Sequence, residues 1–437
     1  MHLPSYVLEV IHTLKSNNKE AFLVGGCVRD LLMNREPVDY DVATSASTAE
    51  IVSIFPKTVP IGARYGTVAV MIGDHSLEVS TFKGQEDAIT DTQVGLEQDL
   101  LLRDFTINAI GMDDLEVIFD PYGGREDLEN RILRAPRNQA EERLKEDPLR
   151  MLRAVRFACV LDLSLHPTIV HGIQNNADLI STVAAERVRV EFDHILTSDR
   201  SARGLRLLAE TGLLEHFLPE VAAMVNFDQR NFRHDKDVFE HSLAVLESVP
   251  PRIRVRLAAL LHDVGKTATF TVDKKGVGHF YGHHEEGRKM TETILRRLRY
   301  DNQTIEDVSI LVIEHMSRFA GLKGANLKKL LKRVGEDNLY DLYDLQRADI
   351  LGSAPPFDFS ALDAMQEEIA RILCEEPPLN IKDLAIDGDD LIALGYCPGP
   401  QLGSVLNSLL EVVLDNPDKN ERFFLINMAR EQMGSQQ

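Results

Sequence analysis

The feature that most constrains this chain is a pair of glycines that follows a short apolar run. Residues 21–24 are apolar and predict a β-strand, and Gly25 and Gly26 directly after them let a ligand approach the backbone without an intervening side chain. Arg29 and Asp30 are expected to open the next helix, whose N-terminal N–H groups and dipole favour phosphate. A glycine pair alone is usually only a turn. The order of strand, glycines and arginine suggests a phosphate-binding loop, and the other motifs of the chain decide whether this interpretation holds.

Three carboxylates follow at positions suited to hold a divalent metal. Asp39 and Asp41 are two residues apart, and on a strand this spacing places both on one face. Glu78 lies on a second predicted strand, residues 77–81, and would add a third carboxylate, although exposed glutamates are common on strands. Two Mg²⁺ ions held there would stabilise both the attacking and the leaving oxygen of a phosphoryl transfer. Together with the glycine pair, this pattern predicts nucleotidyl transfer.

The composition is that of an ordinary globular protein made of several domains. At 437 residues the chain is too long for one core, so two to four domains are expected; 44% of the residues are hydrophobic and 27% are charged. No apolar run approaches the length of a membrane span, and the N-terminus lacks a secretory signal. The cysteines show neither metal-type spacing nor a disulfide framework; they are Cys27, Cys159, Cys374 and Cys397. We therefore expect a cytoplasmic protein with no membrane partner.

The negative charge limits how the chain can bind nucleic acid. A formal charge of −21 argues against contact over the whole surface. Basic segments lie at residues 252–256, 296–299 and 323–333, and each is equally well explained by a solvated helix face. A local basic stripe therefore stays compatible with the charge.

The predicted fold class is α+β, with the strands confined to the N-terminal part. Residues 1–136 alternate β-like runs with helices and predict a head built on one small sheet. Beyond residue 136 the apolar positions recur at helical spacing, and the chain reads as nearly all helix. Prolines punctuate this helical part. We expect a helical body at residues 137–225, a third unit at 226–355 and a helical tail at 356–437.

A second polar segment lies near the end of the head. Arg103 is suited to pair with phosphate, and Asp104 and Asn108, four residues apart on a predicted helix, are suited to hold a ribose or the sheet edge. The simpler interpretation is a buried helix with Asp104 as its N-cap. A glycine-rich turn at residues 120–127 is interpreted as structural, and another at residues 62–67 is a weak candidate for a triphosphate contact.

Residues 146–153 carry a carboxylate and two arginines that match the edge of a nucleobase. Asp147 before Pro148 is a good helix N-cap, but this leaves Arg150 and Arg153, three residues apart on one face, unexplained. Cytosine and adenine present an amino donor beside a ring-nitrogen acceptor, whereas uracil and guanine present the opposite order. A carboxylate beside a guanidinium accepts from the amino group and donates to the ring nitrogen. Asp147 with Arg150 is therefore suited to select C and A in place of a nucleic-acid template.

These motifs, in this order, resemble the class II tRNA nucleotidyltransferases, the family of CCA-adding enzymes and bacterial poly(A) polymerases. The resemblance covers residues 20–195 and is highly specific. The matching segments are Gly25-Gly26-x-x-Arg29-Asp30, Asp39-x-Asp41, Arg103-Asp104-Phe-Thr-Ile-Asn108-Ala, Asp120-Pro-x-Gly-Gly, Glu146-Asp147-x-x-Arg150-x-x-Arg153 and Glu186-Arg187-x-x-x-Glu191.

The resemblance implies a polymerase-beta-like head, Mg²⁺ as cofactor, CTP and ATP as substrates, and a tRNA 3′ end as primer. By motif match, Asp39 and Asp41 would be the metal ligands. Asp147 and Arg150 would be the template pair, with Arg153 assisting. The full set of expected nucleotide-binding residues is Gly25, Gly26, Arg29, Arg103, Asp104, Asn108, Asp147, Arg150 and Arg153, and the expected catalytic carboxylates are Asp39, Asp41 and Glu78.

One departure from the family pattern bears on the product. Full CCA-adding members carry a longer loop before the Arg-Asp-Phe segment, usually with a basic Arg-Arg-Pro-Asp stretch. Here only residues 83–102 intervene, they are acidic, and the arginine that normally precedes the Arg-Asp pair is Leu102. This resembles members that add only the two cytidines and leave the final adenosine to a separate A-adding enzyme.

The third unit carries histidines and aspartates that suit a second metal site. His241, His262, Asp263 and Asp349 each lie on a predicted helix and resemble the ligands of HD-domain metal phosphohydrolases. His283 and His315 match the additional histidines of members that hold a second metal or bind phosphate. The full set of candidate residues in this unit is His241, His262, Asp263, His283, His315 and Asp349. The resemblance implies a divalent metal such as Mn²⁺, Ni²⁺ or Mg²⁺, and we expect phosphate-ester hydrolysis because every ligand position is filled.

The resulting expectation is an enzyme that adds C, as CC or as the full CCA, to tRNA 3′ ends. Three alternatives stay open. A poly(A) polymerase would extend RNA with ATP alone, against which the acidic composition speaks. A protein that is mainly an HD phosphohydrolase would keep its main activity without Asp39. A non-catalytic RNA-binding protein would need neither metal site, which the intact carboxylates disfavour.

Overall fold

The computed structural model describes residues 3–62, 66–83, 95–230, 236–319, 324–374 and 378–434. By its internal contacts the chain divides into two compact units, Met1–Phe217 and Leu218–Gln437. The predicted head and most of the predicted helical body fall in the first unit, and the predicted HD-like unit and tail fall in the second. The boundaries of the four predicted domains stay predictions. No helix in the described part of the chain has the length and apolar character to cross a membrane.

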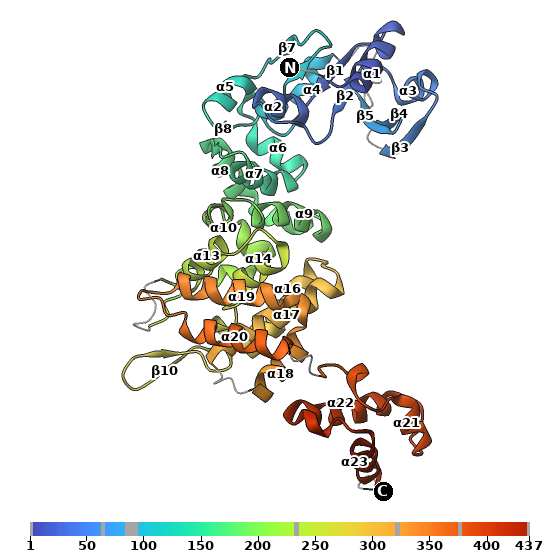
Figure 1. The fold of residues 1–437 in the computed structure, drawn as a ribbon. Helices are drawn as coiled ribbons and strands as arrows, with labels where there is room; N and C mark the ends of the chain where they lie inside the picture. The colour runs from blue at the N-terminus through green and yellow to red at the C-terminus, as the bar shows by residue number, and fades with distance from the viewer. Residues whose placement is uncertain are drawn as a thin grey trace. The chain divides into compact units, whose positions relative to one another are not determined.

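The head is built on one mixed sheet of seven strands in the order β3-β4-β5-β2-β1-β6-β7 (Figure 1). β2 and β5 are parallel, and the other neighbours are antiparallel. The strands are β1 (Ala21–Val24), β2 (Asp41–Thr44), β3 (Thr58–Gly62), β4 (Thr67–Ile72), β5 (His75–Thr81), β6 (Gly111–Met112) and β7 (Ile118–Phe119). The strands predicted from the sequence at residues 21–24 and 77–81 correspond to β1 and β5. The fold class is therefore confirmed for the head.

The parallel pair in the middle of this sheet sets the positions of the carboxylates. Asp41 is the first residue of β2 and stands directly opposite Glu78 of β5. Residues opposite each other on neighbouring strands point to the same face, so Glu78 is a neighbour of Asp41. Asp39 lies in the bend before β2, so the prediction that both aspartates lie on the strand is wrong for Asp39. β2 begins at Asp41, two residues after Asp39.

Helices cover the sheet and form the core of the head. Apolar residues of α1 (Ser5–Ser16) and α2 (Gly26–Leu32) pack with those of the strands around fully buried Ile11, Leu23 and Val28. α2 begins at Gly26, so the prediction that Arg29 and Asp30 open this helix is wrong, and both lie in its second turn. The remaining elements of the head are α3 (Thr48–Ile54), α4 (Leu96–Leu101), the 3-10 turn η2 (Thr106–Asn108) and α5 (Gly124–Glu129).

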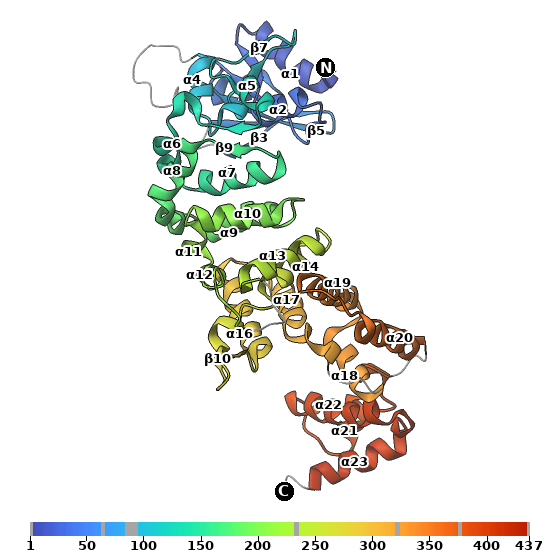
Figure 2. The same ribbon diagram turned by 90° about the vertical axis from the view of Figure 1, so that its left-hand side faces the viewer.

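The rest of the first unit is helical apart from one short strand pair. α7 (Leu149–Val160), α9 (Ala185–Leu196) and α10 (Ser201–Glu210) pack against one another (Figure 2). Pro148, which lacks an N–H group, separates α7 from α6 (Ala140–Glu146). The other elements are the parallel strand pair β8 (Ile132–Leu133) and β9 (Ser164–Leu165), η3 (Pro136–Asn138), α8 (Pro167–Asn176), η4 (Ala177–Thr182) and α11 (Leu213–Phe217).

The second unit is also helical, as predicted, apart from a short hairpin. Its elements are α12 (Pro219–Ala222), α13 (Val238–Ser248), α14 (Ile253–Leu261), α15 (Lys266–Thr269), β10 (Thr271–Val272), β11 (Gly278–His279), α16 (His283–Arg297), α17 (Asn302–Glu314), η5 (Ser317–Phe319), α18 (Gly324–Val334), α19 (Glu336–Gly352), α20 (Ser360–Cys374), η6 (Ile381–Asp383), α21 (Gly388–Ala393), α22 (Pro400–Asp415), η7 (Pro417–Lys419) and α23 (Arg422–Gly434). α13, α14, α17 and α19 pack together, and α16 lies along α17 (Figure 2).

Candidate active sites

A pocket of about 620 Å³ in the first unit brings together most of the residues predicted for nucleotide transfer. Its walls come from the loop after β1, the start of β2, the segment around η2 and the helix α7. The predicted residues that line it are Gly25, Gly26, Arg29, Asp39, Asp41, Arg103, Asp104, Asn108, Asp147, Arg150 and Arg153. Glu78 is not part of this lining and reaches the site only as the neighbour of Asp41.

The carboxylates at this pocket repel one another. Burial, followed by the charges of Asp39 and Glu78, raises the pKa of Asp41 to about 6. Arg103 and Lys83 act in the opposite direction without cancelling this effect. A divalent cation is the group that relieves such repulsion, and carboxylate oxygens are the ligands that Mg²⁺ prefers. The donor set therefore fits the metal that the family resemblance implies.

Gly25 lets Arg103 approach these carboxylates. Its φ of +79° lies in the region that favours glycine. A Cβ built on Gly25 would lie 2.8 Å from Nη1 of Arg103 and 3.9 Å from Oδ2 of Asp41. The Nε of Arg103 in turn donates to Oδ2 of the buried Asp99, at 2.9 Å. Glycine is thus required here both for its backbone conformation and for space.

A buried network links the head to α7. Asn108 donates from Nδ2 to Oδ1 of Asp104 (2.9 Å) and accepts at Oδ1 from Nη1 of Arg29 (2.8 Å). Arg153 donates from Nε and Nη2 to Oδ2 of Asp104, at 3.0 and 2.7 Å. Burial raises the pKa of Asp104, but Arg153 and Asn108 outweigh it and lower this pKa to about 2. Asn108 is the last residue of the single 3-10 turn η2, and Asp104 lies two residues before this turn. The predicted helix through both residues is therefore wrong.

Asp147 and Arg150 line the same pocket, but each is bonded to other residues. Arg150 donates from Nη1 to the carbonyl oxygen of Arg143 (2.9 Å) and to Oε2 of Glu146 (3.1 Å). Asp147 accepts from Nη2 of Arg187 at its Oδ2 (3.0 Å) and from the backbone N–H of Leu149 at its Oδ1 (3.3 Å). The cap of α7 is Pro148, one residue after the predicted Asp147. The role of this pair as a template stays a prediction.

Sequence reasoning missed six residues that line this pocket: Lys83, Arg156, Phe157, Val160, Leu161 and His194. Three guanidinium groups surround the ring of Phe157, with Cζ of Arg156, Arg29 and Arg153 at 4.5, 5.2 and 5.4 Å from its centroid. The spacing of Phe157 and Val160 after Arg150 and Arg153 continues one helical face. That periodicity was a sufficient signal for the α7 residues. Lys83 and His194 carry no comparable signal.

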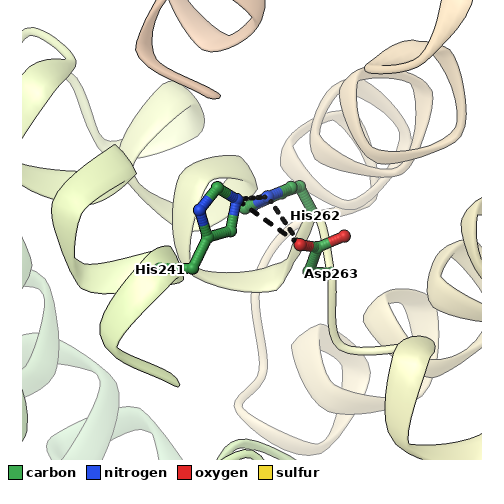
Figure 3. A group of neighbouring side chains, drawn as sticks. All are labelled: His241, His262 and Asp263. Atoms are coloured by element: carbon green, nitrogen blue, oxygen red, sulfur yellow. Dashed lines mark hydrogen bonds and ion pairs between the residues drawn. The ribbon is translucent and has the colours of Figure 1, made fainter. Parts of the chain in front are cut away.

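In the second unit, the predicted HD residues converge on one buried point. Figure 3 shows His241, His262 and Asp263 turned toward one another. The Nε2 atoms of the two histidines are 3.3 Å apart, and Oδ2 of Asp263 lies 3.2 Å from Nε2 of His262 and 3.5 Å from Nε2 of His241. Oδ1 of Asp349 lies 3.1 Å from Nε2 of His241. All four predicted ligands are brought together.

The two additional histidines form a second cluster on the same aspartate. Nε2 of His283 and Nε2 of His315 are 3.3 Å apart and lie 3.5 and 4.0 Å from Oδ1 of Asp263. Asp263 therefore faces one cluster with each of its oxygens. Each oxygen of Asp263 thus has one pair of histidines beside it. This set of donors suits two divalent metals, one at each histidine pair.

The histidines are oriented as metal ligands usually are. Nδ1 of His262, His283 and His315 lies 2.9, 2.9 and 2.6 Å from the carbonyl oxygens of Ala259, Phe280 and Val312. An Nδ1–H bonded to a carbonyl leaves the lone pair of Nε2 directed at the centre. Burial lowers the pKa of His315 to about 3, which keeps this imidazole neutral and able to ligate.

Two cations partly balance the carboxylates of this centre. Nζ of the buried Lys266 lies 2.7 Å from Oδ2 of Asp263 and donates to Oε1 of Gln229 at 2.8 Å. Nη2 of Arg318 donates to Oδ2 of Asp349 at 2.6 Å. Burial raises the pKa of Asp263, but His262 and Lys266 outweigh it and hold this pKa well below its usual value. For Asp349 too, His241, His262 and Arg318 outweigh burial and hold the pKa well below its usual value. Both aspartates are therefore ionised at neutral pH, as metal ligands must be.

The basic segments considered for RNA binding are largely paired with acids. Nε of Arg252 donates to Asp341 at 2.9 Å, and Arg297 donates to Glu220 at 2.8 and 2.6 Å. In the segment 323–333, Lys329 and Lys332 pair with acids of α22, and residue 323 lies outside the described residues. The residues 63–65 of the weak glycine-rich turn and 84–94 of the short acidic segment also lie outside them. The paired arginines and lysines favour solvated helix faces over an RNA stripe.

Three family models match successive parts of the chain. The poly A polymerase head domain matches residues 21–134. The probable RNA and SrmB-binding site of polymerase A matches residues 162–225, and the HD domain matches residues 238–352. The first of these regions holds most of the pocket's carboxylates, and the third holds both histidine clusters.

Curated relatives of the chain include enzymes with three different products. The A-adding tRNA nucleotidyltransferase of Deinococcus radiodurans is 34% identical over 416 residues, which are 90% of the chain and 91% of that relative. The CC-adding tRNA nucleotidyltransferase of Thermus thermophilus is 33% identical over 411 residues, with 90% and 89% covered. The CCA-adding enzyme of Geobacillus stearothermophilus is 44% identical over 223 residues, which are 49% of the chain and 54% of that enzyme.

A solved structure is similar over the whole chain. The Bacillus stearothermophilus CCA-adding enzyme in complex with CTP superimposes with a TM-score of 0.73 at 30% identity, covering 100% of this chain and 99% of that one.

Proposed function

Because the chain belongs to the tRNA nucleotidyltransferase family, we propose that it transfers cytidine from CTP to the 3′ end of tRNA with Mg²⁺ as cofactor. The observation that carries this proposal is the pocket in which Asp39 and Asp41 lie together with Arg29, Arg103 and Asn108. Metal ligands, phosphate-pairing cations and hydrogen-bonding groups for a sugar line one cavity. Binding of CTP by a relative of similar fold adds support.

The chemistry is an in-line substitution at phosphorus. The 3′ oxygen of the RNA forms a bond to the α-phosphorus of CTP, the bond to the bridging oxygen breaks, pyrophosphate leaves, and the hydroxyl proton is released. Asp39 and Asp41, with Glu78 beside them, would hold Mg²⁺, which lowers the pKa of the attacking hydroxyl and neutralises pyrophosphate. Arg103 lies against Gly25, where it can pair with the phosphates.

The base is selected by Asp147 and Arg150. Arg150 reaches the pocket from the first turn of α7, and the hydrogen bond from its Nη1 to the carbonyl of Arg143 fixes its direction. Asp147 must exchange its contact with the half-exposed Arg187 for the base. This exchange is cheap because solvent-exposed ion pairs contribute little free energy. The pair then accepts from the amino group and donates to the ring nitrogen of cytosine.

Replacing Arg150 by alanine is expected to lower kcat/KM for CTP about 50-fold, because a charge-assisted hydrogen bond to the base is lost. Discrimination between CTP and UTP should fall with it. Single-nucleotide incorporation assays with each triphosphate measure both. Lys145→Ala is the control, since Lys145 is an exposed cation on α6 that pairs with Glu141. Unchanged CTP preference in Arg150→Ala would remove the guanidinium from base selection.

The product is the CC end, and a separate A-adding enzyme completes it. The support is the short acidic segment before Arg103 and the lack of the basic stretch that full CCA-adding members carry. Relatives with A-adding, CC-adding and CCA-adding names are about equally similar, so similarity alone does not choose among these products.

The product is tested with tRNA that ends at the discriminator base. CTP and ATP are supplied separately and together, and product lengths are read on a gel. We expect two added nucleotides with CTP, and no third when ATP is also present. Three nucleotides would show full CCA addition, and a single nucleotide added only to a tRNA that already ends in CC would show A addition. Long tails made from ATP alone would identify a poly(A) polymerase.

The second unit supplies a second activity, the hydrolysis of phosphate esters. Asp263 holds a histidine pair at each oxygen, and this observation favours two divalent metals such as Mn²⁺, Ni²⁺ or Mg²⁺. His241, His262, Asp263 and Asp349 would hold the first, and His283 and His315, with the same Asp263, the second. Metals held there would supply Lewis-acid chemistry for the hydrolysis of cyclic phosphates or phosphate monoesters of RNA ends.

A further inference from the structure

More residues line the nucleotide pocket than the proposed binding of CTP requires. Nucleotidyl transfer requires that the RNA 3′ hydroxyl meets the α-phosphate, so both substrates must enter one cavity. Apart from Lys83, the residues proposed for CTP leave one part of the lining unassigned, formed by Arg156, Phe157, Val160, Leu161 and His194. All of these lie at the C-terminal part of α7, in the turn after it, or on the neighbouring α9.

We propose that this part of the pocket, which we call the α7–α9 end, binds the terminal nucleobase of the RNA primer. The proposal rests on the proposed function and adds to it the position of the second substrate. Val160 and His194 form the accessible surface, and Arg156 with Phe157 support it. The occupant is the last base of a single-stranded RNA end.

The chemistry of the α7–α9 end suits the face of a base. Val160 is apolar, 43% exposed and, unlike the exposed Val190 of α9, part of the pocket lining. His194 is exposed on α9 and lines the same pocket. Behind them, Phe157 is 6% exposed and carries the guanidinium of Arg156 at 4.5 Å from its ring centroid. Single-stranded RNA ends are held mainly by stacking on such flat or apolar side chains, which tolerate any base.

Ion pairs connect the two helices that carry this surface. Nε of Arg156 lies 3.0 Å from Oε2 of Glu191, and Nη1 of Arg153 lies 3.5 Å from Oε1 of the same residue. Glu191 is 5% exposed and belongs to α9, so these ion pairs join α9 to α7. A buried charge without its partner is strongly destabilising, so buried ion pairs of this kind keep both side chains in place.

The position along α7 leaves room for both substrates. Arg150 and Val160 are ten residues apart on one helix, which corresponds to about 15 Å. The incoming base at Arg150 and the primer base at Val160 can therefore be bound at the same time. The carboxylates Asp39 and Asp41 line the same cavity.

The test compares His194→Ala, His194→Phe and Val160→Ser in steady-state addition of cytidine to tRNA. For His194→Ala and Val160→Ser we expect KM for tRNA to rise about 10-fold, with KM for CTP unchanged, because stacking on one base is lost. His194→Phe should restore the wild-type KM for tRNA, which a merely structural role of the imidazole would not explain. Val190→Ala is the matched control, since Val190 is 48% exposed on the same helix and lies outside the pocket lining.

A modified substrate makes the test specific to the base. A tRNA whose terminal nucleotide is abasic should raise KM about 10-fold with the wild-type protein and cause little further change with His194→Ala. Additive losses, an unchanged KM for tRNA, or a raised KM for CTP would each overturn the inference. If the wild-type protein adds no nucleotide to any tRNA, the proposed function fails instead, and the two failures are thereby distinguished.

Discussion

Replacing Asp41 by asparagine is expected to reduce nucleotide addition at least about 1000-fold. Asp41 is the central carboxylate of the pocket, with Asp39 before it in the chain and Glu78 opposite it on β5. The amide keeps the shape of the side chain but removes the charge that binds a divalent cation. Metal stabilisation of the transferring phosphoryl group contributes several kcal/mol, and each 1.36 kcal/mol corresponds to a tenfold change in rate. Single-turnover incorporation of cytidine at saturating Mg²⁺ measures the loss.

The same variant should not lose stability, which separates a catalytic role from a structural one. The pKa of Asp41 is raised from 3.8 to about 6, so its ionised form is disfavoured in the folded protein. This cost grows as the pH rises from about 4 to 6 and is complete above that range. At pH 7.5 without divalent metal, Asp41→Asn should therefore melt at the same temperature as the wild type or higher. Thermal unfolding followed by circular dichroism provides the measurement.

The control for Asp41→Asn is Asp74→Asn, which changes an exposed aspartate in the turn between β4 and β5. It should leave both addition and melting temperature unchanged. If Asp41→Asn still adds cytidine at a rate within tenfold of the wild type, Asp41 holds no catalytic metal and the proposed mechanism is wrong. A large drop in melting temperature would instead assign the loss to misfolding.

The family and the fold class could be predicted from the sequence because both depend on local patterns. The short apolar run before Gly25 predicted β1, and helical periodicity predicted the helices beyond residue 136. The comparisons with known proteins confirm the family. Asp39 shows where such patterns fail. The spacing of two residues from Asp41 suggested one strand, but the ladder with β5 begins at Asp41, so pairing with a distant strand decided where β2 starts.

The partners of individual side chains could not be predicted, because they depend on contacts between distant segments. The sequence placed Arg153 beside the base selector, whereas the structure bonds it to Asp104, 49 residues away, and to Glu191 on α9. Burial of Asp104 makes this pairing necessary, and burial was not visible in the motif. The six HD residues are the opposite case. Their chemistry requires convergence, so their identity predicted a cluster that helix packing then brings together.

Replacing Asp263 by asparagine is expected to abolish phosphate-ester hydrolysis and metal binding in the second unit while nucleotide addition continues. Each oxygen of Asp263 faces one histidine pair, so one substitution removes a ligand from both proposed metal positions. Hydrolysis of a cyclic nucleotide phosphate in Mn²⁺ or Ni²⁺ should fall at least about 1000-fold. Metal content after dialysis, measured by mass spectrometry, should fall from two ions per chain to none.

His283→Gln sharpens this prediction, because it touches only the second cluster. It should retain one ion per chain, held by His241, His262, Asp263 and Asp349, and lose most hydrolysis. Asp273→Asn, an exposed aspartate beside β10, is the control and should retain both ions and full hydrolysis.

Folding must be checked in the Asp263 variant, because Lys266 then loses its buried carboxylate partner. Breaking a buried ion pair costs about 3–5 kcal/mol, so reduced stability of the second unit is expected. His262→Gln avoids this problem, since it removes a ligand of the first metal and leaves the pair of Lys266 and Asp263 in place. If His262→Gln binds metal and hydrolyses the cyclic phosphate like the wild type, the histidine clusters serve only to pack the helices. Cytidine addition at the wild-type rate in both variants would place the two activities in separate sites of one chain.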